Sequence, residues 1–227
     1  MREDTVEGLV AKYIPDGSVV ALGSGHLSES FLKRLAFRMV SLEEKFLFIP
    51  TSMHLAALAA ELRIPITSID EHEVDVAVEF PTQLDHDYNF LKSSSHSLIR
   101  DKMICQSATD LICVCEKKDF VERLSGAIAF EIAMFGSKRT LLELSKFGKT
   151  DLLREGKRDF HTESANLLAL CKPDAIFSLE DLEFQTKQIP GVIETGLFIG
   201  YADRMILFNP GIEAKSRVQV STSKKKG

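Results

Sequence analysis

The chain has 227 residues, a formal net charge of −5 at pH 7, 44% hydrophobic residues and 27% charged residues. This composition excludes disorder over most of the length, and the negative charge argues against a protein that holds nucleic acid by electrostatic attraction. No stretch of about 18 uncharged apolar residues occurs, so we expect a soluble globular protein that does not bind a membrane.

The first half of the chain alternates short apolar strands with helices. Pro15-Asp16-Gly17 ends the first helix, and Gly23-Ser24-Gly25 joins the first strand to a helix with Ser28 as its expected N-cap. Buried strands separated by helices predict an α/β fold, a parallel sheet with helices on both faces. The expected strands are residues 18–22, 46–49, 64–69, 75–78 and 110–115, and the expected helices are residues 4–14, 28–40, 53–62 and 96–108.

The alternation stops near residue 125, and a smaller α+β lobe is expected there. We predict that residues 1–124 and 190–227 form the main core and that residues 125–189 form the smaller lobe, within one folded unit. The polar segment 148–162 is expected at the surface. The expected strands are residues 127–134, 166–171, 175–177, 196–199 and 204–208, and the expected helix is residues 140–144.

The cysteines and histidines indicate neither a disulfide framework nor a metal site. Four cysteines at irregular spacing fit a reducing compartment. Cys113 and Cys115 alternate in an apolar run, so we expect them buried in a strand. His54, His72, His86 and His161 share no ligand spacing, and no metal is expected. We predict a cytoplasmic protein, with an organelle such as a plastid as the alternative if a transit peptide has been removed.

Three segments follow one another with a characteristic order and spacing. They are residues 19–25 with Ile-Pro-Thr-Ser at 49–52, residues 74–78 with Asn-Phe-Leu-Lys at 89–92 and Ile-Arg-Asp-Lys at 99–102, and Ile-Pro-Gly-Val-Ile-Glu-Thr-Gly-Leu-Phe at 189–198. In this order they resemble the type A ribose-5-phosphate isomerases over nearly the whole chain.

The resemblance implies a fold and a reaction. The fold is a Rossmann-like parallel-sheet core with a smaller α+β lobe. The reaction is the interconversion of ribose 5-phosphate and ribulose 5-phosphate in the pentose phosphate pathway, in which a proton moves between C1 and C2 through an enediolate. The resemblance also implies a sugar phosphate as ligand, no metal or organic cofactor, and a homo-oligomer.

The resemblance implies a phosphate site at Gly23, Ser24 and Gly25, where a helix begins. The family's loop reads Gly-Thr-Gly-Ser-Thr, whereas His26 and Leu27 stand here at the last two positions. We expect weaker phosphate binding, with His26 as a substitute donor. From the residues alone, a short Gly-x-Gly is more often only a strand-to-helix turn.

The family's acidic loop, Asp-Gly-Ala-Asp-Glu, corresponds to residues 79–83 of this chain. Glu79 keeps a carboxylate for ring opening and proton transfer. Thr82 cannot ionise, so one acid is lost and Thr82 stays a candidate only for substrate binding. Pro81 removes an amide donor, and we expect the loop backbone to differ from the family's.

Lys92 corresponds to the family lysine that stabilises charge on a substrate oxygen. Ser93 and Ser94 stand where the family has glycines, so an anion-binding nest of amides is expected to be weakened there, and both serines are candidate ligand contacts. Lys118 corresponds to a lysine that reaches toward the ligand, although the neighbouring Lys117 makes that register ambiguous.

Asp101 corresponds to the family's general base, which is a glutamate in a Leu-Arg-Glu-Lys context. Its side chain is one methylene shorter, and a displacement of about 1 Å at a reacting group lowers a rate on the order of a hundredfold. From the residues alone, Arg100-Asp101-Lys102 is more often a solvated helix face.

Three functions follow from these residues. The first is an isomerase with Asp101 as base, Lys92 as electrophile and Glu79 as auxiliary acid, with activity reduced or lost. The second is a non-catalytic homologue that binds a sugar phosphate or serves as a regulatory or interaction subunit; changes confined to the loops favour it over full activity. The third is a different phosphorylated or carboxylated substrate, which the bulkier Phe80 and His96 would suit.

Overall fold

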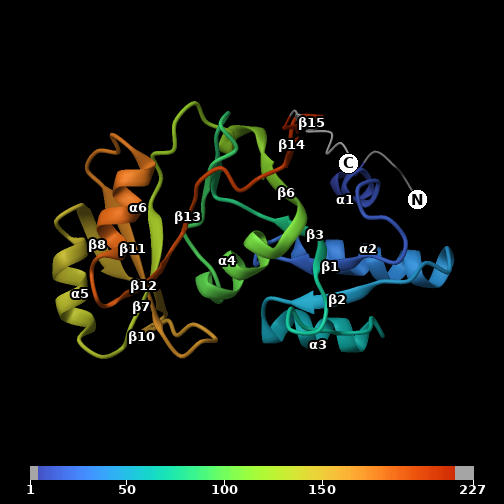
Figure 1. Cartoon of the computed structure of the whole chain (residues 1–227), viewed down its shortest axis with the longest axis horizontal. Coiled ribbons are helices and arrows are strands. Elements are labelled where there is room, and N and C mark those ends of the chain that lie inside the picture. The colour runs from blue at the N-terminus through green and yellow to red at the C-terminus, as the bar shows by residue number, and fades with distance from the viewer. Residues whose placement is uncertain (1–4, 218–227) are drawn as a thin grey trace, which may run out of the picture.

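A six-stranded sheet forms the larger half of the molecule (Figure 1). The computed structural model describes residues 5–217. The strand order is β15-β14-β6-β3-β1-β2, and neighbouring strands are parallel except for β15, which is antiparallel to β14. Its strands are β1 (Val19–Leu22), β2 (Leu47–Pro50), β3 (Val74–Glu79), β6 (Ala108–Glu116), β14 (Arg204–Phe208) and β15 (Ile212–Ser216).

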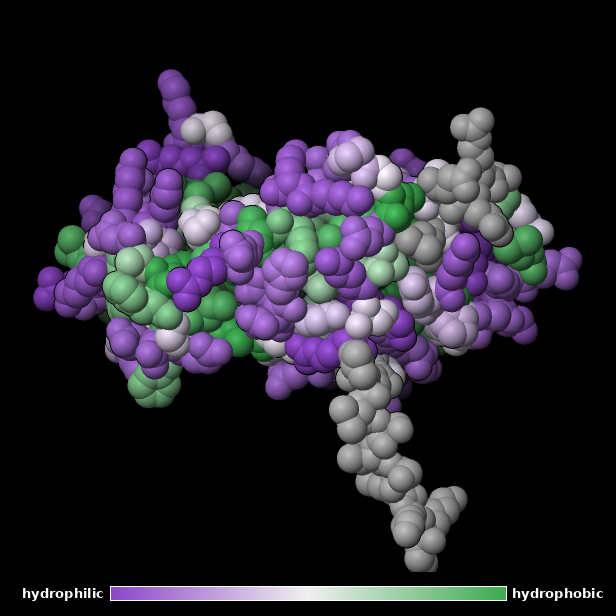
Figure 2. All heavy atoms as spheres, turned by 90° about the horizontal axis from the view of Figure 1, so that it is seen from above, coloured by the Kyte–Doolittle hydropathy of each residue, from purple (hydrophilic) through white to green (hydrophobic). Residues whose placement is uncertain are grey.

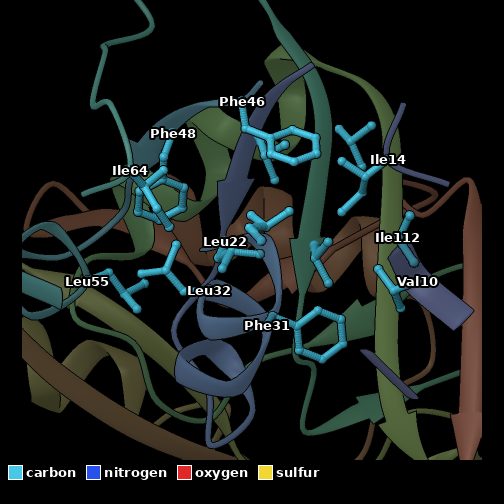
Figure 3. Close-up of a cluster of buried hydrophobic side chains, with 14 of the residues drawn as sticks. Val10, Ile14, Leu22, Phe31, Leu32, Phe46, Phe48, Leu55, Ile64 and Ile112 are labelled. Atoms are coloured by element: carbon cyan, nitrogen blue, oxygen red, sulfur yellow. The ribbon is translucent and has the colours of Figure 1, made fainter. Parts of the chain in front are cut away.

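Both faces of this sheet are covered, because successive side chains of each buried strand point to opposite sides. Val20 and Leu22 of β1 join a core with α1, α2 and α3, part of which is seen in Figure 3. Val19 and Ala21 join a second core with α4 and the three-stranded sheet β13-β5-β4. These elements are α1 (Val6–Ala11), α2 (Ser28–Ser41), α3 (Met53–Glu61), α4 (Leu98–Ser107), β4 (Gln83–Leu84), β5 (Phe90–Leu91) and β13 (Leu197–Phe198).

A four-stranded antiparallel sheet, in the order β12-β7-β11-β8, forms the other half. Helix α4 lies between the halves and contacts β3 and β6 on one side and β7 and β12 on the other (Figure 1). Side chains of α4 are therefore held by both sheets. The remaining elements are β7 (Ile128–Ile132), β8 (Gly148–Leu152), β11 (Leu167–Pro173), β12 (Val192–Thr195), α5 (Ser137–Leu144), α6 (Leu179–Lys187), the hairpin β9 (Arg154–Glu155) and β10 (Arg158–Asp159), and a 3-10 turn (Lys117–Asp119).

The expected parallel α/β core with helices on both faces is confirmed, while two expected strands are wrong. Residues 64–69 make only an isolated bridge through Ile66 to Phe48, because Pro65 has no N–H to continue a ladder. Residues 175–177 are irregular, and Phe177 is 94% exposed. Ser178 then caps α6, which the sequence interpretation omitted although Ser178 and two following acids are a helix-start signal.

Ser28 is the first residue of α2 and not its N-cap, which corrects the expected capping. The cap position is Leu27, which has no side chain that can accept a hydrogen bond, and the Ser28 hydroxyl donates to Gly25 O instead. The first backbone N–H groups of α2 therefore have no capping side chain.

The boundary between the main core and the smaller lobe stays a prediction. β12 follows residue 190, yet it pairs with β7 in the smaller sheet. Within residues 5–217, no helix has the length and apolar character needed to cross a lipid bilayer.

Candidate active site

Three charged side chains meet between the two sheets. The Lys92 ammonium donates to Glu79 Oε2 over 2.7 Å and to Asp101 Oδ2 over 2.5 Å. Lys92 is 1% exposed, and Glu79 and Asp101 are 0% exposed. One cation between two buried carboxylates leaves a net charge of −1 when all three groups are ionised, so the cluster favours retention of a proton.

Each of these residues comes from a different element. Glu79 is the last residue of β3, at the carboxyl end of a parallel strand where open α/β sheets place their ligands. Asp101 lies in the first turn of α4. Lys92 follows β5, and its backbone N–H donates to Gly196 O while its carbonyl accepts from Ala129 N. The interpretation of Asp101 as part of a solvated helix face is therefore wrong, because α4 is covered on both sides.

Gly196 allows the chain to pass close to Lys92. A Cβ atom added at Gly196 would lie 2.3 Å from Lys92 O and 3.0 Å from Ala129 O, which are backbone atoms that cannot turn away. We expect Gly196→Ala to lower the free energy of unfolding by about 1–3 kcal/mol and to displace Lys92. Urea unfolding measures the loss. Gly126→Ala is the control, because its closest neighbour is the flexible end of the Gln83 side chain; equal losses in both variants would contradict the expectation.

The two oxygens of Asp101 differ in their partners. Oδ2 accepts from Lys92 and from Ser95 Oγ, the latter over 2.6 Å. Oδ1 is buried and has no hydrogen-bond partner among the residues that the structure describes. An unpaired carboxylate oxygen is costly inside a protein and is well suited to accept a proton.

Burial and charge shift the pKa values of this cluster. Burial raises the pKa of Glu79 to about 7; Lys92 opposes the rise and Asp101 adds to it. Burial disfavours the charged form of Lys92, but the carboxylates of Asp101 and Glu79 outweigh burial and raise its pKa above the usual value. Glu79 thus has a pKa at which it can both give and take a proton near neutral pH, while Lys92 stays cationic.

Cys105 of α4 is a third neighbour of Glu79. Its thiol lies 3.7 Å from Glu79 Oε1, and burial raises the pKa of this thiol. Cys105 therefore stays a neutral thiol and a weak donor to the carboxylate. Cys113 and Cys115 are buried in β6, as expected of small hydrophobic residues.

A cavity of about 400 Å³ lies at the end of β1. Glu79, Lys92 and Asp101 do not line it, but Ser95 of its lining donates a hydrogen bond to Asp101 Oδ2. Ser24 Oγ is buried in its wall and has no partner within the described chain. The turn passes close to the cluster, because a Cβ at Gly23 would fall 2.1 Å from the Glu79 carboxylate and one at Gly25 would fall 2.4 Å from Phe80. The lining consists of Ser24, Gly25, His26, Ser28, Glu29, Ser52, His54, Leu55, Ser94, Ser95, His96, Leu153, Arg154, Glu155 and Phe160.

The structure brings together only some of the candidate site residues. Ser24, Gly25, His26 and Ser94 line the cavity, and Gly23 contacts Glu79. Thr82 and Ser93 are not in the lining; their hydroxyls hydrogen-bond to each other over 2.8 Å. Lys118 is also outside it, with a side chain 70% exposed and paired with Glu116.

Sequence reasoning left several lining residues out of the candidate site. His54 pairs with Glu29 over 2.9 Å, and His96 packs edge-on against Phe160. Glu29 and His54 stand in the first turns of the helices that follow β1 and β2, a position that could have marked them. Phe160 had no such signal. Within residues 5–217, no group of three or more His, Cys, Asp or Glu side chains is arranged to hold a metal ion.

Comparison with known proteins identifies the family. A family model for ribose 5-phosphate isomerase A (phosphoriboisomerase A) matches residues 47–211, well over half of the chain. The chain belongs to this family. Ribose-5-phosphate isomerase A 2 of Oceanobacillus iheyensis is 34% identical over 203 residues, covering 88% of this chain and 91% of the relative. Ribose-5-phosphate isomerase A of Methanothermobacter thermautotrophicus is 33% identical over 201 residues, covering 85% and 87%.

Solved structures of ribose 5-phosphate isomerases share the fold. A D-ribose-5-phosphate isomerase in complex with phospho-erythronic acid has a TM-score of 0.87 and 29% identity, covering 93% of this chain and 96% of that chain. The Methanocaldococcus jannaschii enzyme also has a TM-score of 0.87, at 22% identity and with the same coverage. The fold and the family assignment from the sequence are confirmed.

Proposed function

We propose that this protein is an aldose-ketose isomerase that interconverts ribose 5-phosphate and ribulose 5-phosphate, with a turnover reduced by its short base. The observation that carries the proposal is the convergence of Lys92, Glu79 and Asp101 within hydrogen-bond distance at the end of β3. A cation between two carboxylates is the set of groups that an enediolate reaction needs.

Asp101 is the proposed general base. Its unpaired Oδ1 takes the proton from C2 of the open-chain aldose and returns it to C1. The Lys92 ammonium stabilises the negative charge that develops on the substrate oxygens, and Glu79 moves the proton between O1 and O2. For this, a substrate oxygen must replace one carboxylate at Lys92, since the ammonium now bonds to both.

The phosphate group is proposed to bind at the cavity end near Ser24 and His26. The free Ser24 hydroxyl and the uncapped start of α2 offer donors and a favourable helix dipole. Glu29, also in the lining, opposes an anion there, although its pair with His54 offsets part of that charge. We therefore propose phosphate binding that is weaker than in the family's hydroxyl-rich loop.

A non-catalytic sugar-phosphate binder is the second candidate. Two observations favour it. Glu79, Lys92 and Asp101 are at most 1% exposed. Thr82, which stands where the family's pattern has a second acid, is hydrogen-bonded to Ser93. Such a protein would keep the cavity and lose the reaction.

Asp101→Glu separates the two candidates. The added methylene restores the reach of the base, so we expect turnover of ribose 5-phosphate in a coupled assay to rise by about a hundredfold. Asp101→Asn is the matched control and should be inactive. Absence of turnover in the wild-type protein and in Asp101→Glu, with a folded protein, would exclude the isomerase.

Ligand binding is measured in parallel, because a binder without activity would still respond. Phospho-erythronic acid, which occupies the related isomerase structure, is the probe. A ligand at 100 times its Kd stabilises the native state by about 2.7 kcal/mol, which thermal unfolding resolves. If neither phospho-erythronic acid nor ribose 5-phosphate changes the melting temperature, both candidates fail.

Several expectations stay predictions, namely a homo-oligomer, a cytoplasmic location and no affinity for nucleic acid. The homo-oligomer has some support from apolar surface over the half that carries the smaller sheet (Figure 2). In that half, Phe135 is 96% exposed, Phe177 is 94% exposed and Phe184 is 66% exposed.

A further inference from the structure

Glu131 is a buried carboxylate that the proposed reaction does not use. It lies in β7 of the smaller sheet and is 0% exposed. In the part of the chain that the structure describes, no basic side chain forms an ion pair with it. A buried charge without a cation is costly unless hydrogen bonds replace its water, so the partners of Glu131 require an explanation.

The two oxygens of Glu131 face different parts of the molecule. Oε1 accepts from Thr162 Oγ1 over 2.7 Å and from Asn166 Nδ2 over 3.0 Å, both in the segment that leads into β11. Oε2 accepts from the backbone N–H of Ile99 over 3.2 Å and from Ser97 Oγ over 3.4 Å, at the start of α4. The carboxylate therefore lies at a helix N-terminus, where free N–H groups and the helix dipole favour a negative charge.

Helix α4 connects this contact to the reacting groups. Asp101 N–H donates to Ser97 O over 3.1 Å, and Asp101 Oδ2 accepts from Ser95 Oγ. Ser95 Oγ also accepts from Ser97 N–H over 2.9 Å. Ser97, the N-cap of α4, thus joins the hydroxyl contact with Glu131 to a direct bond with the Asp101 backbone and, through Ser95, to the Asp101 carboxylate.

Lys102 fixes the other side of the same helix turn. Its ammonium donates to Leu197 O and pairs with Glu183 over 2.9 Å. It is 7% exposed and lies over the ring of Phe198. The contacts of Lys102 therefore fix the side of α4, whereas those of Glu131 fix its N-terminus.

We infer that Glu131 is a positioning residue, which sets the place where Asp101 meets Lys92 by holding the N-terminus of α4. The catalytic part of this inference rests on the proposed isomerase. The smaller sheet then has a defined task in the site: its strand β7 supplies the carboxylate that fixes the helix carrying the base.

Glu131→Gln is the test, because it keeps the size of the side chain and removes its charge. An NH2 group, which cannot accept a hydrogen bond, replaces one of the two carboxylate oxygens. Either Ile99 and Ser97 or Thr162 and Asn166 then lose their acceptor. We expect α4 to shift and Asp101 to withdraw from Lys92. Thr162→Val removes only one donor to Glu131 and should shift α4 in the same direction by a smaller amount. It replaces Glu131→Gln as the test if Glu131→Gln does not fold.

The first readout does not depend on turnover. The negative charge of Asp101 contributes to the raised pKa of Glu79. If Asp101 withdraws, Glu79 becomes the only carboxylate bonded to Lys92, and its pKa should fall by about one unit. Carbon-13 NMR of the Glu79 carboxyl group follows this titration midpoint. Ile132→Val, in the same strand and equally buried, is the control: it lowers stability by about 0.5–1.5 kcal/mol and should leave the midpoint unchanged.

The second readout is steady-state kinetics with ribose 5-phosphate. We expect Glu131→Gln to lower kcat by about tenfold with KM unchanged, since only the base is displaced. If neither the wild-type protein nor Asp101→Glu turns over ribose 5-phosphate, the proposed isomerase fails while the NMR titration still tests the positioning role. A folded Glu131→Gln with an unchanged Glu79 midpoint would overturn the inference.

Discussion

Lys92→Met is expected to lower the free energy of unfolding by about 3–5 kcal/mol at pH 8. Methionine has a similar length and fits the apolar surroundings, so the loss comes from charge and not from a cavity. Without the ammonium, Glu79 and Asp101 become two buried carboxylates with no cation between them. Urea unfolding at constant ionic strength measures the loss.

The loss should depend on pH. At pH 5 the Glu79 carboxyl, whose pKa is raised by burial, already carries a proton, so less uncompensated charge remains and the variant should lose less stability. Lys146→Met, at a side chain 68% exposed, is the matched control and should change stability little at either pH. The explanation fails if Lys92→Met behaves like this control at pH 8.

A triple variant tests the origin of the effect. Adding Glu79→Gln and Asp101→Asn to Lys92→Met removes every charge of the cluster, and we expect it to recover most of the lost stability. Failure to recover would mean that packing of the Lys92 side chain, and not compensation of charge, holds this region together.

Glu79→Gln is expected to become more stable relative to the wild-type protein as the pH rises. Burial raises the pKa of Glu79 from 4.5 to about 7, so between these values the native state binds more protons than the unfolded state. Stability contributed by Glu79 is therefore complete below pH 4.5 and is lost as the pH rises through 7, by about 3 kcal/mol in total. Glutamine does not ionise and shows no such loss.

The measurement is the difference in unfolding free energy between wild type and Glu79→Gln, taken from pH 4.5 to pH 8. Glu143→Gln is the control, because Glu143 lies at the surface with Lys146 and its pKa is lowered; it should show no gain as the pH rises. A Glu79→Gln difference that does not change with pH would show that Glu79 is ionised throughout this range.

Local sequence signals were sufficient for most of the larger sheet. Runs of β-branched and apolar residues such as 19–22 and 74–79 form strands buried on both faces, and glycine turns mark their ends. Lys92, Glu79 and Asp101 were candidates through the family's pattern, and the fold brings them together. Periodicity alone would have missed Asp101, since three consecutive charged residues read as a solvent-exposed turn of helix.

Short and weakly paired elements were harder to predict. β4, β5 and β13 have two residues each, too few for alternation to be recognised, yet Lys92 directly follows β5 and its N–H donates to Gly196 O, just before β13. β12 joins the smaller sheet only because the chain returns to β7 after α6. Long-range pairing of this kind leaves no local trace.

The sequence by itself determined the alternation of strands and helices, the turn at Gly23 and Gly25, and the types of charged residue available for chemistry. Only the tertiary structure decided which charges are buried. Glu131 in an apolar strand and Asp101 in a charged helix turn are both 0% exposed because α4 lies between two sheets. Burial is a property of what packs against a residue, and those neighbours are distant in the chain, so the pKa of Glu79 and the place of Asp101 depend on contacts that no local pattern encodes.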